Sequence, residues 1–116
     1  SGPGSYTGLR IGVATAKGLC FGLGIPLIAI GSLPLLMQQV LPFNTNQYWL
    51  CPMLDARRME VYTQLFSVNG QPQSEVHALV VDQSSFKDTL DHQGILFFGN
   101  GTGKCKETIQ HPNAFF

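Results

Sequence analysis

Two glycine-rich loops are the parts of this sequence best suited to holding an anion. The first comprises residues 2–8 and the second residues 99–104, and a helix is predicted to follow each of them. Unpaired backbone N–H groups and the helix dipole at such a position attract phosphate or carboxylate. A plain tight turn is the alternative interpretation of both loops. The residues that could contact a phosphate are Gly2, Gly4, Ser5, Thr7, Gly99 and Gly101.

The second loop is not a complete P-loop. That motif requires glycine, four intervening residues, and then Gly-Lys followed by serine or threonine. Phe98 stands at the first glycine position, and Cys105 replaces the hydroxyl that would bind magnesium. The strict motif is therefore excluded. Because neither loop has a general base or metal ligands beside it in the sequence, no catalytic residue and no metal site is predicted.

A cluster of charges between two predicted strands is a further candidate binding site. Arg57 and Arg58 lie between Asp55 and Glu60 around a predicted turn. An arginine at this place could bind a carboxylate or a phosphate through two parallel hydrogen bonds. Solvated hairpin charges with weak salt bridges are the alternative. The three histidines lie in unrelated contexts and are interpreted as isolated surface residues: His77, His92 and His111.

The composition argues against nucleic-acid binding by the chain alone. Its 116 residues contain seven Lys plus Arg and seven Asp plus Glu, whereas nucleic-acid-binding surfaces are usually basic. Hydrophobic residues make up 44% and charged residues only 12%, which suggests that missing chain or a partner covers much of the surface. Three scattered cysteines indicate a reduced, cytoplasmic protein: Cys20, Cys51 and Cys105.

The helix predicted over residues 7–23 is apolar on two sides, which is typical of a helix with two packing partners. Its glycines include pairs one turn apart, so another backbone can approach closely. A buried core helix and a seam between two helices both fit this pattern. In the second interpretation, two basic residues on a polar strip orient the partner, and the interface comprises Leu9, Arg10, Gly12, Val13 and Lys17. If the other face of the helix meets the partner, Ile11 and Ala14 take the place of Leu9 and Val13.

The remaining elements can be predicted from periodicity. Residues 18–54 contain no charge and are long enough to cross a bilayer, but repeated glycine and proline divide them into separate elements. A buried strand is predicted over residues 27–30, and Ser32 is predicted to cap a helix ending near Pro42. Further predictions are strands over 48–54, 60–68, 75–81 and 95–98, turns at 55–58 and 69–70, a short helix from Ser84 or Ser85 to Leu90, and another ending at Pro112.

Several segments closely resemble the TsaB family, also called YeaZ. Residues 2–18 resemble the family's hallmark segment and read Gly-Pro-Gly-Ser-Tyr-Thr-Gly-Leu-Arg-Ile-Gly-Val-Ala-Thr-Ala-Lys-Gly. Residues 24–33 resemble the part that follows. Residues 55–62 resemble the second signature, although Met59 stands where the family usually has glycine or a similar residue. Residues 99–101 fall at a glycine turn of the family, so the resemblance covers essentially the whole chain.

The resemblance implies an α/β fold that is a fragment of the two-lobed actin-like architecture shared with Hsp70 and sugar kinases, with its ribonuclease H-like motif. Residues 1–31 would form the C-terminal part of the first lobe, and residues 32–116 an incomplete second lobe. The opening strands and the C-terminal end of the family are not in the sequence. We therefore expect the chain to be an internal fragment of a longer protein.

The resemblance also implies a non-catalytic role in making threonylcarbamoyladenosine on ANN-decoding tRNAs in the bacterial cytoplasm. The chain would bind and activate the transferase TsaD and, with it, recruit the ATPase TsaE. ATP and metal would belong to those partners, with no cofactor in this chain, and tRNA would be met only indirectly. A homodimer is a further expectation, and no membrane is involved. The alternative is an enzyme in its own right, either an ATPase or an M22-type glycoprotease-like peptidase.

Overall fold

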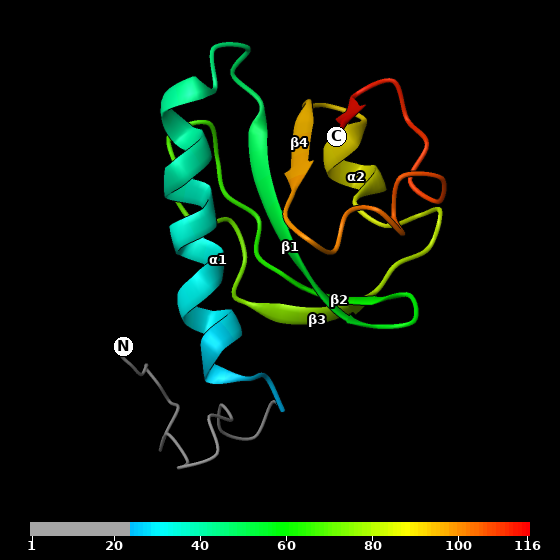
Figure 1. Cartoon of the computed structure of the whole chain (residues 1–116). Helices are drawn as coiled ribbons and strands as arrows, with labels where there is room; N and C mark the ends of the chain where they lie inside the picture. Colours follow the sequence, from blue (N-terminus) through cyan, green and yellow to red (C-terminus); the bar gives the residue numbers. More distant parts are fainter. Residues whose placement is uncertain (1–23) are drawn as a thin grey trace.

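Two helices flank a central sheet in the computed structural model, which describes residues 24–116 (Figure 1). The helix predicted over residues 7–23 lies outside the described residues. In chain order the elements are α1 (Leu27–Val40), the 3-10 turn η1 (Leu41–Phe43), β1 (Trp49–Arg57), β2 (Glu60–Thr63), β3 (His77–Val80), α2 (Lys87–Leu90), β4 (Ile95–Phe98) and β5 (Ala114–Phe115).

β1 is the central strand of a five-stranded sheet whose order is β3-β2-β1-β4-β5. It runs antiparallel to β2 and parallel to β4, and β4 runs parallel to β5. A parallel pair needs a crossover connection, which here contains β2, β3 and α2. The predicted α/β class is confirmed, and the mixed sheet is compatible with a fragment of the actin-like fold.

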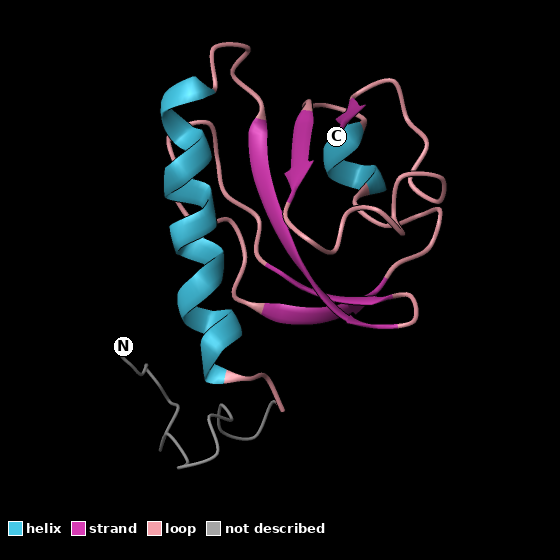
Figure 2. Cartoon of the chain, viewed as in Figure 1, coloured by secondary structure: helices cyan, strands magenta, loops and turns pink. Residues whose placement is uncertain are grey.

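Both faces of the sheet are covered, so its central strands are apolar on both sides. Leu50 of β1 lies in a cluster with Met37 of α1, whereas Cys51 and Met53 lie in a cluster with Leu90 of α2. Figure 2 shows the two helices on opposite sides of the sheet. The larger core lies on the α2 side and comprises Cys51, Met53, Val61, Leu65, Val81, Leu90, Ile95, Phe97, Cys105 and Ile109.

The strand predicted over residues 27–30 is wrong, because these residues form the first turn of α1. A run of four apolar residues fits either a strand or a helix. The longer spacing decides between them, since Ala29, Leu33 and Met37 recur every four residues and are all buried.

Among residues 24–116, no helix combines the length and apolar character needed to span a bilayer.

Ser32 is not the cap of α1, contrary to prediction. The carbonyl of Pro26 accepts the N–H of Ala29 at 3.0 Å, so the helix begins before Ser32 is reached. The predicted end is confirmed, since α1 stops at Val40 and the following 3-10 turn contains Pro42. The boundary predicted between residues 31 and 32 lies inside α1, and the division into two lobes stays a prediction.

β1 is longer than predicted. It continues through Arg57, so residues 55–57 belong to the strand, and only Arg58 and Met59 form the turn into β2. This tight turn holds Arg58 at a φ of +47°, in the left-handed region. The other predicted strands are confirmed in position as β2, β3 and β4, with β2 and β3 shorter than predicted.

The predicted turn at residues 69–70 is confirmed. Gly70 has a φ of +83° and donates its N–H to the carbonyl of Ser67 at 2.9 Å. Before the turn, Phe66 pairs with Leu50 of β1 as an isolated antiparallel bridge, and it also pairs with Pro72 after the turn. These bridges hold the segment between β2 and β3 against the sheet.

The helix α2 ends at Leu90 as predicted, but neither Ser84 nor Ser85 caps it. The residue before the helix is Phe86, whose φ is +64°. The two serines instead bind Asp82. The N–H of Ser84 donates to Oδ1 of Asp82 at 2.9 Å, and Oγ of Ser85 accepts the N–H of Asp82 at 2.9 Å. These side chains therefore stabilise a turn that precedes the helix.

The helix predicted to end at Pro112 does not form. Residues 99–109 make a series of turns instead, including one in which the N–H of Cys105 donates to the carbonyl of Thr102 at 2.9 Å. The chain then returns to the sheet as β5, which has only two residues and no pattern from which to predict it. The ring of Phe115 stacks on Tyr48 with 4.4 Å between centroids.

Asp91, directly after α2, links this helix to the C-terminal segment. Its Oδ2 accepts a hydrogen bond from Nζ of Lys87 at 2.9 Å, and its Oδ1 lies 3.0 Å from Nε2 of His111. The hydrogen bond from Lys87 has the largest effect, and together with the contact to His111 it holds the pKa of Asp91 below its ordinary value. The ionised carboxylate therefore stabilises the fold above about pH 4, and this contribution is lost as the pH falls through the lowered pKa.

We expect Asp91→Asn to lower the unfolding temperature of the intact protein at about pH 6, and this effect to shrink as the pH falls through the lowered pKa of Asp91. Thermal unfolding followed by circular dichroism across this range measures the difference. Glu75→Gln is a matched control, because Glu75 is exposed and its carboxylate forms no ion pair among residues 24–116. A difference that stays constant as the solution is acidified would contradict the assignment.

Candidate functional site

The carboxyl ends of β1 and β4 meet at one edge of the sheet and bring two predicted sites together. β4 pairs with β1 as far as Phe98 opposite Pro52, and β1 then runs on through Arg57. The glycine loop after β4 lies beside this extension of β1. In open α/β sheets, ligands bind beyond the carboxyl ends of parallel strands. Arg57 at the end of β1, Arg58 in the β1–β2 turn and the second glycine loop therefore all lie at this edge of the sheet, which is the candidate site.

Hydrogen bonds attach the glycine loop to β1. The N–H of Gly101 donates to the carbonyl of Met53 at 2.9 Å, and Oδ1 of Asn100 accepts the N–H of Asp55 at 2.8 Å. Asn100 thus continues the pairing of β1 after β4 has ended. No pattern near Asn100 in the sequence indicates this role, because its partner lies 45 residues away.

The two glycines of this loop are required by its close approach to β1. Gly99 has a φ of +106°, and a Cβ added there would lie 2.3 Å from the carbonyl oxygen of Met53. A Cβ at Gly101 would lie 2.9 Å from the carbonyl carbon of Leu54. Packing against a strand therefore explains both glycines as a tight turn. Because no helix follows the loop among the described residues, a phosphate contact by Gly99 and Gly101 stays a prediction.

Lys104 fastens the end of the loop to both strands of the hairpin. Its Nζ donates to Oδ1 of Asp55 and, at 2.7 Å, to the backbone carbonyl of Glu60. The positive charge of Lys104 is thus matched by Asp55 and does not remain available for a ligand. Sequence reasoning missed this ion pair, since 49 residues separate its partners.

Arg57 and Arg58 are the available positive charges of the site. Both side chains are exposed, and neither takes part in an ion pair among residues 24–116. They border a shallow hollow of about 360 Å³ whose other lining residues are Met59, Glu60 and Val80. The predicted ability of these arginines to contact an anion stays a prediction, and the structure adds an apolar hollow beside them.

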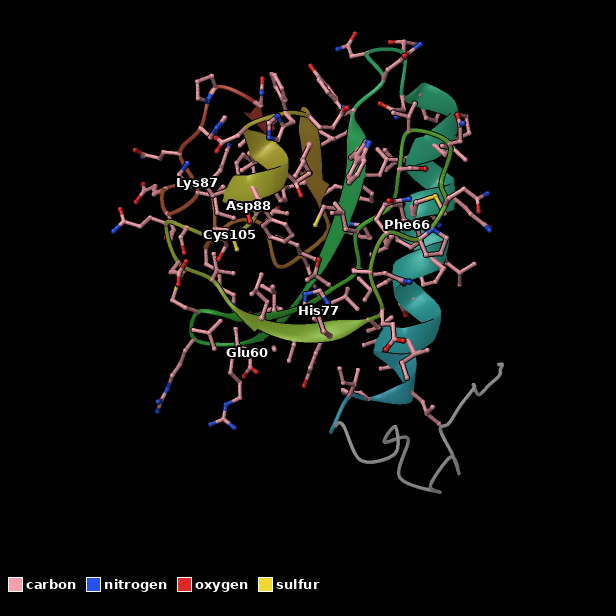
Figure 3. All side chains as sticks on the ribbon, turned by 180° about the vertical axis from the view of Figure 1, so that it is seen from behind. Glu60, Phe66, His77, Lys87, Asp88 and Cys105 are labelled. Atoms are coloured by element: carbon pink, nitrogen blue, oxygen red, sulfur yellow. The ribbon has the colours of Figure 1, made fainter. Side chains whose placement is uncertain are left out.

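The remaining reactive side chains lie apart from this hollow. Cys51 and Cys105 are buried in the core on the α2 side and do not line the hollow; in Figure 3, Cys105 is labelled above Glu60 of β2 and His77 of β3. Burial raises the pKa of the Cys51 thiol to about 12 and also raises the pKa of Cys105. Both thiols are therefore protonated at neutral pH. Among residues 24–116, no group of three or more His, Cys, Asp or Glu side chains could hold a metal ion.

The other predicted site residues precede the described part of the chain. These are the first glycine loop, with Gly2, Gly4, Ser5 and Thr7, and the helix interface, with Leu9, Arg10, Gly12, Val13 and Lys17. Their roles as phosphate contacts and as a partner seam stay predictions.

Sequence comparison places the fold and the site in a known family. The model of the family described as "TsaD: tRNA N6-adenosine threonylcarbamoyltransferase" matches residues 1–112. The chain belongs to this family. The match includes β1, the β1–β2 turn and the loop after β4, so the candidate site lies within the TsaD-type domain. No solved structure matches the chain.

Within the TsaD-type family, the chain matches proteins named "tRNA threonylcarbamoyladenosine biosynthesis protein TsaB", which confirms the predicted resemblance. The Bacillus subtilis TsaB is 38% identical over 112 residues, covering 94% of this chain and 48% of that protein. Those of Haemophilus influenzae and Escherichia coli are 39% and 41% identical over 61 residues, covering 53% of this chain and 25% and 26% of theirs. The chain spans about half the length of the Bacillus relative.

Proposed function

We propose that the protein acts in the biosynthesis of threonylcarbamoyladenosine on ANN-decoding tRNAs, as a non-catalytic partner of the transferase TsaD. The observation that carries this proposal is the similarity to Bacillus subtilis TsaB along 94% of the chain. The described site supports a binding role, because its available groups are two exposed arginines beside an apolar hollow. Such groups hold a partner by charge and by apolar contact.

The proposed partner role divides the chemistry between proteins. TsaD carries out the transfer with its metal, TsaE hydrolyses ATP, and this protein binds TsaD and recruits TsaE through that complex in the cytoplasm. The helix seam would make the main contact through Leu9, Gly12 and Val13. Arg10 and Lys17 would orient TsaD, and the same surface would serve a homodimer when TsaD is absent. Contact with tRNA would be indirect, through the complex.

A charged residue in the seam should prevent TsaD from binding. We expect Gly12→Glu to reduce capture of TsaD from the same organism by at least about tenfold, because a buried charge is placed between two helices. Co-purification of the tagged intact protein with TsaD measures the effect, and the threonylcarbamoyladenosine content of cellular tRNA provides a second readout.

The matched control is Gly103→Glu, since a Cβ at Gly103 meets no atom within 4 Å. This variant introduces the same charge and should retain TsaD. Equal capture of TsaD by wild type and Gly12→Glu would refute the seam. Hydrolysis of ATP, or cleavage of a protein substrate, by the intact protein without TsaD would refute the non-catalytic role and favour the enzyme alternative.

A further inference from the structure

β3 is an edge strand of the sheet, and within residues 24–116 no strand pairs with its outer side. The strand order places β3 at the end of the sheet with β2 as its neighbour (Figure 1). Proteins usually protect such an edge with charged side chains, proline or a bulge, because its backbone groups can pair with another chain. The four residues of β3 are His-Ala-Leu-Val, and their pairing with β2 is regular from His77 to Val80.

The ladder shows which backbone groups of β3 face outward. The N–H of Val81 donates to the carbonyl of Met59 at 2.9 Å, which places Val81 and Met59 at a hydrogen-bonded position of the ladder. Bonded and non-bonded pairs alternate along an antiparallel ladder. Leu79 therefore bonds to β2, whereas Ala78 and Val80 direct their N–H and C=O groups away from β2. These outward groups have the spacing that an added strand requires.

An apolar surface lies at the same end of β3. Val80 is 66% exposed, which is high for an apolar residue in a strand. Val80 lines the hollow together with Met59, and the other lining residues are Arg57, Arg58 and Glu60. An extended peptide paired with β3 would bring an apolar side chain into this hollow, as alternate side chains do in strand addition.

The charge at the hollow selects an acidic partner. Arg57 and Arg58 line the hollow without ion-pair partners among residues 24–116, against the single carboxylate of Glu60. The local excess is therefore positive, although the whole chain has no net charge. A phosphate backbone would use the arginines but not the apolar lining residues or the outward amides. An acidic peptide uses all three features.

We propose that the β3 edge is a docking site for an extended, acidic segment of another protein. The segment adds to the sheet beside β3, bonds to the backbone of Ala78 and Val80, and places an apolar side chain in the hollow beside Val80. Its carboxylates pair with Arg57 and Arg58. This inference does not rest on the proposed function, because its test involves neither TsaD nor tRNA.

Amide hydrogen exchange of the intact protein with a synthetic peptide provides the direct test. The probe is a peptide of alternating valine and threonine with glutamates at both ends. We expect exchange at Ala78 and Val80 to slow when the peptide is added, while the amide of Leu79 changes little because it is already bonded. Unchanged exchange at Ala78 and Val80 at a peptide concentration of about 1 mM would overturn the proposal.

Binding of the labelled peptide, followed by fluorescence anisotropy, tests the charge and the edge separately. Arg57→Gln with Arg58→Asn should weaken binding by about tenfold, and asparagine is chosen because it tolerates the left-handed φ of residue 58. Val80→Pro should abolish binding, since it removes an outward N–H without removing a ladder bond. Val80→Thr keeps that N–H and loses only apolar contact, so it should bind the peptide more strongly than Val80→Pro does.

Two comparison probes complete the experiment. The same peptide with lysine in place of glutamate should bind at least about tenfold more weakly, because it meets the arginines with like charge. Single-stranded polyuridine RNA should not compete with the acidic peptide. Equal binding of the two peptides, or displacement of the acidic peptide by the RNA, would overturn the proposal. Circular dichroism of each variant confirms that a loss of binding is not a loss of fold.

Discussion

Gly99→Ala should destabilise the intact protein by about 3 kcal/mol or more, because two independent costs act at this position. Gly99 has a φ of +106°, which L-residues with a Cβ rarely adopt. The added Cβ would also lie 2.3 Å from the carbonyl oxygen of Met53. That oxygen belongs to the central strand and accepts the N–H of Gly101, so it cannot move aside without loss of the contact.

Urea unfolding monitored by circular dichroism measures this effect. Gly103→Ala is the matched control in the same loop, since a Cβ there meets no atom within 4 Å. We expect this control to change the free energy of unfolding by no more than about 0.5 kcal/mol. If Gly99→Ala and Gly103→Ala had the same unfolding midpoint, the docking of the loop against β1 would be wrong.

Phe97→Ala should have the second large effect, a loss of about 3–5 kcal/mol in the free energy of unfolding. Phe97 is 1% exposed and lies in the core on the α2 side. Its ring meets Phe86 edge-on with 5.3 Å between centroids and stacks on Phe116 at 5.0 Å. Truncation would remove these contacts and leave a cavity between β4, α2 and the C-terminal segment.

Phe43→Ala is the matched control for this substitution, because Phe43 is 80% exposed. The same chemical change at the surface should alter the unfolding free energy by no more than about 0.5 kcal/mol. Chemical denaturation of both variants at one pH gives the comparison. Equal losses for Phe97→Ala and Phe43→Ala would show that β4 does not lie in the main core.

The strands and turns with strong local signals could be predicted from the sequence. β4 is an unbroken apolar run of four residues that both faces of the sheet require. The turn at residues 69–70 was predictable because glycine is suited to its φ of +83°. In each of these cases, the signal that predicts the element lies within a few residues of the sequence.

Elements whose signals extend beyond a few residues of the chain were predicted wrongly or missed. Residues 27–30 join α1 because the buried spacing continues to Leu33 and Met37. β5 has two residues and exists through its pairing with β4. The segment after β4 forms turns rather than a helix, and it is attached to distant strands because Gly101 donates to β1 and Lys104 to β2.

The parts of the candidate site could be found individually, but not their assembly. Arg57, Arg58, Gly99 and Gly101 stand out by residue type alone. Their proximity follows from the parallel pairing of β1 with β4, which no local pattern specifies. The hollow beside Val80 also requires knowledge that β3 is an outer strand. Sequence reasoning therefore identified candidate ligands of an anion but not the apolar surface beside them.

The buried thiol of Cys51 allows opening of the central sheet to be measured by chemical modification. Cys51 is fully enclosed, lies 3.2 Å from Oγ1 of Thr63, and has a pKa of about 12. A thiol reagent can modify Cys51 only when β1 separates from its neighbours, because the side chain is otherwise both inaccessible and protonated. The rate at which the reagent modifies Cys51 thus reports how often the sheet opens. Because Cys51 is present in the wild-type sequence, this measurement needs no introduced cysteine.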